Sequence, residues 1–226
     1  MCGRFYISEE EIADELLRIV GEAVLNSQFT DSGVNPRELK TCGEVFPSDY
    51  VPVCEQGEYT IRSLGASGVG FRALGAVWGF PINGTSQLVI NARAEAAADR
   101  AMFQRARPCV VPATNYFEWE VLRVERPVQL AFDGMDIQLP ERVEKRKRSI
   151  RPNRSGFFYM AGLIRHLPHM LPDFTIVTIP AAKTIEHIHD RMPSILSPDR
   201  AREWLSLSKF SHDFIMDSSE REVSVM

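Results

Sequence analysis

The sequence predicts an α+β fold: a single domain over residues 1–226, with a curved antiparallel sheet or β-barrel-like core and flanking helices. Many short apolar segments of strand character alternate with turn residues, few segments have helical periodicity, and there is no regular β-α-β alternation. With 226 residues, 44% of them hydrophobic and 25% charged, the chain is long enough to bury a sizeable core.

Four segments carry helical signals: about residues 8–22, 94–105, 181–188 and 197–205. In the first, Ser8 and Glu11 form a capping box, and apolar residues then recur at helical spacing. The second is rich in alanine, the strongest helix former. The last begins with Ser197 as N-cap and Pro198 at the first helical position.

Short apolar stretches predict the strands: residues 51–53, 73–78, 88–91, 109–111, 116–121, 128–132, 157–164 and 174–179. Loops are predicted at residues 35–36 and 46–49, where prolines and polar residues gather. Residues 122–141 are the least patterned part of the chain, with a turn at Asp133-Gly134, and we interpret them as an insertion.

Charge and composition exclude several classes of protein. A net charge of −4 argues against a protein that coats nucleic acid by charge excess alone. Residues 141–154 nevertheless carry seven basic and two acidic side chains, so they form either a solvated strand edge or a phosphate site. There is no apolar run long enough to span a membrane and no signal-peptide core, which predicts a cytoplasmic protein, nucleoid-associated when bound to DNA.

The four cysteines have no Cys-x-x-Cys spacing, so we expect reduced thiols, no zinc site and no cofactor. Cys2 is special because removal of Met1 would expose an α-amine beside its thiol. An α-amine has a pKa of about 7.7 to 8.0, so far more of it is neutral at pH 7 than of a lysine amine. An aldehyde captured by the amine can then be closed by the thiol into a five-membered thiazolidine. Alternatively, Met1 remains and Cys2 is an ordinary early residue.

Asn91 and Arg93 emerge two residues apart at the end of a predicted strand, on the same side of it. Such a pair is suited to hold a phosphodiester or a sugar, or forms a turn with a surface arginine. Alternation from Tyr116 to Glu120 places Glu118 among large aromatic residues. Partial burial there would raise the pKa of Glu118 and suit it to proton transfer, whereas an edge strand would leave a solvated carboxylate.

His187 and His189 are spaced two apart, unlike the spacing of four that places two metal ligands on one helix face. A single imidazole that carries a proton near pH 7 is the better interpretation, and we assign this role to His189. Asp190 either orients that imidazole or pairs with Arg191.

Six segments in order complete a pattern: Met-Cys-Gly-Arg-Phe at residues 1–5, then Val-Trp-Gly-Phe at 77–80, Ile-Asn-Ala-Arg-Ala-Glu at 90–95, Phe-Glu-Trp at 117–119, Met-Ala-Gly-Leu at 160–163 and Ile-His-Asp-Arg-Met-Pro at 188–193. Over roughly residues 1–206 the chain resembles the SOS response-associated peptidase (SRAP) family, whose members process abasic sites. The resemblance implies a single α+β domain around a β-barrel-like core that captures the abasic sugar of single-stranded DNA through an N-terminal cysteine, as a thiazolidine crosslink.

The same resemblance implies a role for each matching residue. Cys2 would be the nucleophile, Glu118 the acid/base, His189 the group that assists opening of the sugar ring and reversal of the crosslink, and Asn91 the residue that positions cysteine and sugar. The residues implied to contact DNA are Arg4, Trp78, Arg93 and Arg191. It implies no metal ion.

Two alternative functions remain open at this point. One is a thiol peptidase or amidohydrolase that uses Cys2 as its nucleophile, with self-removal of Met1 as one form of that activity. The other is non-enzymatic binding of single-stranded DNA through arginines and tryptophans. For the favoured function the expected partner is single-stranded DNA with abasic sites. The expected state is a monomer away from membranes, without a docking tail for a replication partner.

Overall fold

The computed structural model describes residues 3–8, 14–28, 38–61, 66–124, 129–130, 136–137, 142–153 and 156–226. It confirms a mixed α+β fold with more sheet than helix. The strands are β1 (Arg4–Ile7), β2 (Gly43–Val45), β3 (Tyr50–Ile61), β4 (Ala66–Trp78), β5 (Phe80–Pro81), β6 (Leu88–Val89), β7 (Asn91–Arg93), β8 (Arg107–Ala113), β9 (Asn115–Val124), β10 (Gln129–Leu130), β11 (Asp136–Ile137), β12 (Arg142–Pro152), β13 (Phe158–Arg165), β14 (Asp173–Pro180), β15 (Arg191–Pro193), β16 (Ile195–Leu196) and β17 (Val223–Val225). The helices are α1 (Asp14–Gln28), α2 (Ala94–Ala97), the 3₁₀ turn η1 (Ala101–Phe103), α3 (Pro198–Ser206) and α4 (His212–Ser218).

The larger sheet curves into a ring. Its strands follow the order β15-β14-β4-β3-β8-β13-β16, and an additional pairing of β13 with β14 closes the ring. The predicted curved sheet is therefore confirmed, in the form of a ring. The sheet departs from the antiparallel expectation in two places, because β14 pairs in parallel with β4 and with β7. β14, which precedes the turn at residues 181–190, therefore has β4 and β7 as its parallel neighbours.

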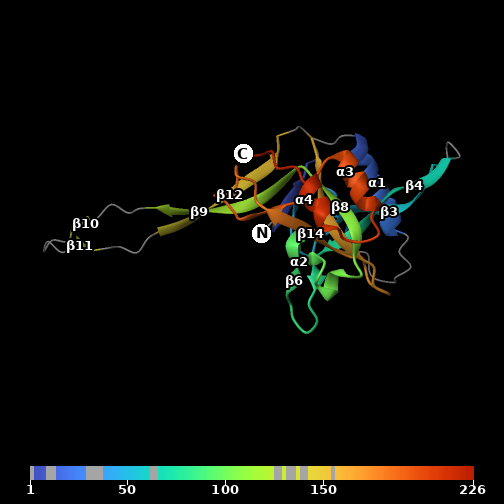
Figure 1. Cartoon of the computed structure of the whole chain (residues 1–226), viewed down its shortest axis with the longest axis horizontal. Coiled ribbons are helices and arrows are strands. Elements are labelled where there is room, and N and C mark those ends of the chain that lie inside the picture. The colour runs from blue at the N-terminus through green and yellow to red at the C-terminus, as the bar shows by residue number, and fades with distance from the viewer. Residues whose placement is uncertain are drawn as a thin grey trace.

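The second sheet is antiparallel, in the order β17-β12-β9-β1-β2. The chain passes from one sheet to the other at Thr114, between β8 and β9, where the backbone N–H and the hydroxyl both donate to the Tyr6 carbonyl. In Figure 1, β9 and β12 project as a two-stranded arm away from the helices, which lie with β3 and β4 at the other end of the molecule.

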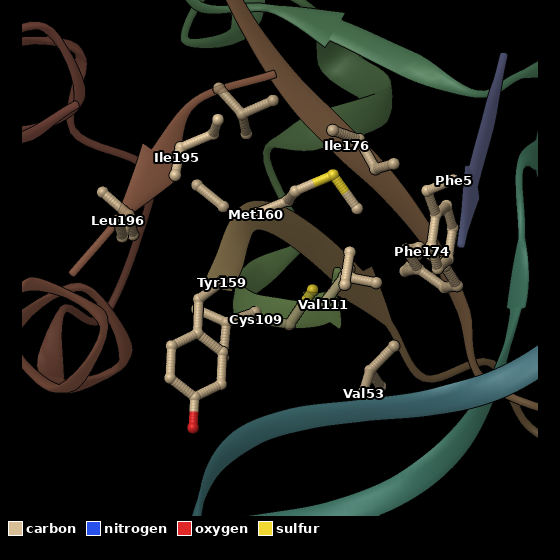
Figure 2. Close-up of a cluster of buried hydrophobic side chains, with 14 of the residues drawn as sticks. Phe5, Val53, Cys109, Val111, Tyr159, Met160, Phe174, Ile176, Ile195 and Leu196 are labelled. Atoms are coloured by element: carbon tan, nitrogen blue, oxygen red, sulfur yellow. The ribbon is translucent and has the colours of Figure 1, made fainter. Parts of the chain in front are cut away.

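The core fills the ring with apolar side chains from neighbouring strands. Every residue of β13 except the last is buried, so both faces of this strand are covered. Figure 2 shows Met160 pointing toward Ile176, while Tyr159, next along the strand, points the other way. The Tyr159 hydroxyl donates to Glu15 of α1 at 2.8 Å, which gives this buried polar group a partner.

The helices agree only in part with the sequence-based expectations. α1 exists but continues to Gln28 rather than ending near residue 22, and residues 9–13, with Glu11 of the expected capping box, lie outside the described residues. The expected start of α3 is confirmed, because the Ser197 hydroxyl accepts from the Arg200 N–H and Pro198 stands at the first helical position. The short helix α4 was not predicted.

Two predicted helices are wrong. Residues 94–105 form only the four-residue α2 and η1, because the chain turns to pack the ring of Phe103 against Phe80, with ring centres 5.9 Å apart. Residues 181–188 form turns instead of a helix. The pairing of Pro180 with Arg191 closes this segment into a connection between β14 and β15, in which turn hydrogen bonds such as Ile185 N–H to the Ala182 carbonyl replace a helix.

Most predicted strands are confirmed, with two changes. The segment 88–91 divides at Ile90, because β6 pairs with β5 and β7 with β14. The basic segment 141–154 provides β12. Its end, residues 150–152, pairs with β17, whereas among the described residues 142–148 pair with β9 alone and most of 143–148 are exposed, as expected for a solvated strand edge. Part of the expected insertion is β10 paired with β11, and the turn at residues 133–134 lies outside the described residues. No helix within the described ranges is long and apolar enough to cross a membrane.

Tight packing inside the ring leads to a stability prediction. A methyl group on Gly162 would lie 2.8 Å from the Cys109 sulfur and 3.0 Å from the Thr175 carbonyl, so Gly162→Ala should lower the free energy of unfolding by about 1–3 kcal/mol. Gly21 in α1 has open space around it, and Gly21→Ala should raise stability by about 0.5–1 kcal/mol. Urea unfolding of both variants checks this, and an unchanged midpoint for Gly162→Ala would contradict the packing.

Candidate functional site

Glu118 is a buried carboxyl group on β9. Glu118 is 3% exposed. The alternation predicted for this strand is present: Tyr116 is buried on the same face as Glu118, and Phe117 and Trp119 are half-buried on the other face. Burial raises the pKa of Glu118 to about 7, and the negative charge of Asp190 acts in the same direction. The predicted raised pKa is therefore confirmed, and the solvated carboxylate is excluded.

His189 lies in the turn that joins β14 to β15. Its Nδ1 accepts a hydrogen bond from the Arg191 backbone N–H at 2.9 Å, which places the proton of the neutral ring on Nε2. Burial lowers the pKa of His189, although the Asp190 carboxylate, 2.9 Å from Nδ1, opposes this shift. Of the two alternatives for Asp190, contact with the imidazole is the one that the structure supports.

Asp190 also links this turn to β9. Its charge affects the pKa values of both Glu118 and His189, so the two titratable groups lie in one electrostatic environment. The pKa of Glu118 is raised and the pKa of His189 is lowered. Near neutral pH, a fraction of the Glu118 carboxyl groups is protonated while most His189 rings are neutral. Such a pair can both donate and accept protons.

β14 brings Asn91 and Arg93 toward the same region. Asn91 pairs in register with Ile176 and Arg93 with Thr178, and further along β14 Pro180 pairs with Arg191. In β7, Ala92 is buried between half-buried Asn91 and exposed Arg93. This alternation agrees with the prediction that Asn91 and Arg93 lie on the same side of the strand. Arg93 is thus an exposed cation beside the turn that carries His189.

Arg191 is buried, and both terminal nitrogens of its guanidinium group have hydrogen-bond partners. Its two terminal nitrogens donate to the two carboxylate oxygens of Glu95 at 2.7 and 2.9 Å, and one of them also donates to the Thr178 carbonyl at 2.6 Å. The hydrogen bonds from Arg191 are the main reason that the pKa of Glu95 is lowered. The guanidinium therefore ties α2 to β14 and β15, and its expected contact with DNA remains a prediction.

Trp78 is also a core residue. It is fully buried, packs against the rings of Phe5 and Phe174, and donates its indole N–H to the Ile90 carbonyl at 3.0 Å. That carbonyl also accepts from Ile176, so the residue before Asn91 is anchored twice. Burial leaves no ring face on which a base can stack, so Trp78 can affect DNA binding only by positioning its neighbours.

Arg4 belongs to the N-terminal motif, begins β1 and lies between two aromatic rings. Its guanidinium carbon lies 4.7 Å from the centre of the Phe46 ring and 4.8 Å from that of Trp119, and Glu44 accepts a hydrogen bond from it at 3.2 Å. Cation–π contacts of this kind fix the side chain while leaving it partly accessible. Its expected role in DNA binding stays a prediction.

Cys2 lies outside the described residues, so its predicted role is examined below from chemistry and chain connectivity. Two of the other three thiols are unsuited to nucleophilic chemistry, because Cys54 and Cys109 are buried and their pKa values are raised by burial. Cys42 is half-buried. Across the part of the chain that the structure describes, no group of three or more potential ligands is arranged to hold a metal ion.

The sequence analysis missed the roles of Glu95 and Glu44. Glu95 belongs to a quoted motif, but its partner is 96 residues away along the chain, so only the fold reveals the pair. Glu44 accepts hydrogen bonds from both Arg4 and Lys147, which lie on different strands. Neither pairing leaves a signal in local sequence.

The fold and site define a class of protein: a sheet-based α+β protein with a buried carboxyl group and an imidazole that can exchange protons near neutral pH. The family model described as "SOS response associated peptidase (SRAP)" matches residues 1–223. This chain belongs to the SRAP family.

Curated relatives carry informative names. The protein named abasic site processing protein YobE of Bacillus subtilis (strain 168) is 29% identical over 134 residues, covering 56% of this chain and 53% of the relative. The protein named abasic site processing protein HMCES of Xenopus tropicalis is 28% identical over 131 residues, covering 53% and 38%. This chain thus spans about half the length, or less, of these relatives.

Two solved structures share the fold. A protein from Bacteroides thetaiotaomicron superposes with a TM-score of 0.59 at 19% identity, covering 99% of this chain and 90% of the other. A phage-related protein from Bordetella bronchiseptica gives a TM-score of 0.57 at 18% identity, covering 100% and 93%. At such identities the likeness concerns the fold alone.

The contrast between the two arginines generates a prediction. Arg191→Ala removes a buried cation and leaves Glu95 and the Thr178 carbonyl without their donor, so it should lower the free energy of unfolding by about 3 kcal/mol. Arg93 is exposed, and Arg93→Ala should change stability by less than about 0.5 kcal/mol. Thermal or urea unfolding distinguishes them. Equal, small effects would contradict the structural role of Arg191.

Proposed function

We propose that this protein captures abasic sites in single-stranded DNA as a covalent thiazolidine crosslink through Cys2, after removal of Met1. The family membership and the names of the relatives support the choice of substrate. One observation carries the proposal: Glu118, with a pKa of about 7, lies buried on the strand that pairs with β1, and β1 begins two residues after Cys2.

Chain connectivity supports the position of the nucleophile. Arg4 pairs with Phe117, the neighbour of Glu118. Consecutive Cα atoms are about 3.8 Å apart, so the Cα of Cys2 is within about 8 Å of that of Arg4 in any conformation. This bound keeps residue 2 close to the start of β1, the strand that pairs with the strand carrying Glu118.

Sugar opening and imine formation come first. An abasic sugar exists mainly as a ring. A water molecule takes the proton of the anomeric hydroxyl and delivers one to the ring oxygen as the ring opens to an aldehyde, and the Nε2–H of neutral His189 stabilises that oxygen with a hydrogen bond. The neutral α-amine of Cys2 then attacks the aldehyde carbon. Protonated Glu118 donates a proton to the resulting hydroxyl, which leaves as water and yields the imine. At a pKa of about 7, a substantial fraction of Glu118 is available as this acid.

Ring closure completes the capture. The imine as formed is protonated on nitrogen. The Cys2 thiol gives its proton to the Glu118 carboxylate formed in the previous step, and its sulfur adds to the imine carbon, so the nitrogen keeps its hydrogen and becomes neutral. The net reaction joins an aldehyde and an aminothiol, with loss of one water. Because both nucleophiles belong to one residue, closure is intramolecular and carries a large effective concentration.

Arg93 and Arg4 are the exposed cations suited to hold the DNA strand. Arg93 is exposed beside the His189 turn, and Arg4 is partly accessible on β1. Asn91, half-buried two residues before Arg93, positions cysteine and sugar. Arg191 and Trp78 act from the core, by holding β15 and the residue before Asn91.

The direct test is crosslinking on a denaturing gel. Purified protein, shown by mass spectrometry to lack Met1, should give a shifted band with single-stranded DNA carrying one abasic site and none with intact DNA. Cys2→Ala should abolish the band, whereas the matched variant Cys42→Ala should retain it.

Three outcomes would contradict the proposal. A crosslink that persists in Cys2→Ala would remove Cys2 from the chemistry. Equal binding of intact and abasic strands without a covalent band would favour a simple DNA-binding protein. Release of peptide or amide products that depends on Cys2, without any crosslink, would favour the thiol hydrolase.

A further inference from the structure

A cavity of about 530 Å³ opens at the end of the ring that lies away from His189, and we name it the arginine pocket. Its lining includes Glu55, Arg72, Arg105, Arg107, Ile164 and His166. This size falls within the range of small-molecule sites, about 300–1,000 Å³.

Strand register explains why these side chains converge. Glu55 of β3 pairs with Arg72 of β4 on one side and with Cys109 of β8 on the other, and Arg107 of β8 pairs with Ile164 of β13. Paired residues point to the same face, and residues two apart on a strand share it. Glu55, Arg72, Arg107 and Ile164 therefore follow one face of four neighbouring strands, while Arg105 lies in the turn just before β8 and His166 just after β13.

Positive charge dominates the pocket. Among the described residues that line it, Glu55 is the one acid, and it is buried and already engaged with Arg72 at 2.5 Å and His166 at 2.7 Å. These partners more than offset the cost of burial, and the pKa of Glu55 is lowered. Three guanidinium groups against one carboxylate leave an excess of two positive charges even when His166 is neutral.

Arg105 and Arg107 are the exposed members. Neither makes a side-chain hydrogen bond or an ion pair with any residue that the structure describes, unlike Arg72, Arg148, Arg165 and Arg191. Two unneutralised guanidinium groups in one concavity repel each other, and an anion would relieve this repulsion. Guanidinium groups fit the paired oxygens of a phosphate, to which they donate two hydrogen bonds.

The pocket is separate from the Glu118 site. β14 begins at Asp173, which pairs with Arg165 next to Ile164 and His166, and ends at Pro180, which pairs with Arg191. Seven residue steps at about 3.3 Å per residue separate these ends by roughly 23 Å. A ligand in the pocket therefore does not occupy the region of His189.

We propose that the arginine pocket binds a phosphate group, presented by a free nucleotide or by a nucleic-acid strand. Arg105 and Arg107 supply the donors at the mouth, and Arg72, held against Glu55, forms the fixed wall. This assignment does not depend on the capture of abasic sites, because it rests on a different end of the molecule.

Calorimetric titration with three probes tests the pocket: inorganic phosphate, thymidine monophosphate and an intact oligothymidylate. The double variant Arg105→Gln, Arg107→Gln should weaken binding of at least one probe by tenfold or more. The matched control Arg123→Gln, Arg202→Gln also removes two exposed arginines, one on β9 and one on α3, and should stay within twofold of the wild type. Both variants should keep the wild-type unfolding midpoint, since the four side chains are exposed.

The pattern across probes identifies the ligand source. Loss for phosphate and the mononucleotide, with unchanged oligonucleotide affinity, supports a free nucleotide, whereas loss confined to the oligonucleotide supports a strand. Equal affinity of wild type and the Arg105, Arg107 double variant for all three probes overturns the proposal, as does an equal loss in the control. Crosslinking of a short abasic oligonucleotide, measured in parallel, should be unchanged, so failure of the pocket and failure of abasic-site capture are distinguishable.

Discussion

The antiparallel pairing of β1 with β9 is the constraint on which the candidate site depends. β1 has only four residues, yet it holds the beginning of the chain beside the strand that carries Glu118. Phe5 packs against Trp78 in the core, and Arg4 is held by Phe46 and Trp119 on the outer face. A strand secured on both faces is held in a fixed position beside Glu118, and such preorganisation is what the proposed intramolecular chemistry needs.

Electrostatics then set what the site can do. Burial alone would keep Glu118 protonated and His189 neutral, and Asp190 reinforces the first shift while opposing the second. The result is a carboxyl group with a pKa of about 7 and an imidazole whose pKa lies below its usual value. The ion pair between Arg191 and Glu95 stabilises this arrangement, because it anchors β15, the strand that follows the His189 turn.

Local patterns predicted the parts of the structure that local physics decides. The alternation at residues 116–120 correctly placed Glu118 on the face opposite Phe117 and Trp119 but left its burial open, and Ser197 with Pro198 correctly marked the start of α3. Tertiary demands overrode helix propensity at residues 94–105, where Phe103 packs against Phe80, and at 181–188, where a strand pairing closes the loop. Likewise, the burial of Trp78 and the pairing of Arg191 with Glu95 depend on residues far apart in sequence. No single motif contains that information.

The pH dependence of the crosslinking rate, measured from pH 5 to 9 at saturating abasic DNA for the wild type and Glu118→Gln, tests the central claim most directly. The account predicts a change of slope near pH 7 in the wild type, the pKa that burial gives Glu118. It also predicts that Glu118→Gln loses this change and is slower by about 100-fold or more, with nearly unchanged DNA affinity. Identical rates and pH profiles for the two proteins would contradict the assignment of Glu118 as the acid/base of the reaction.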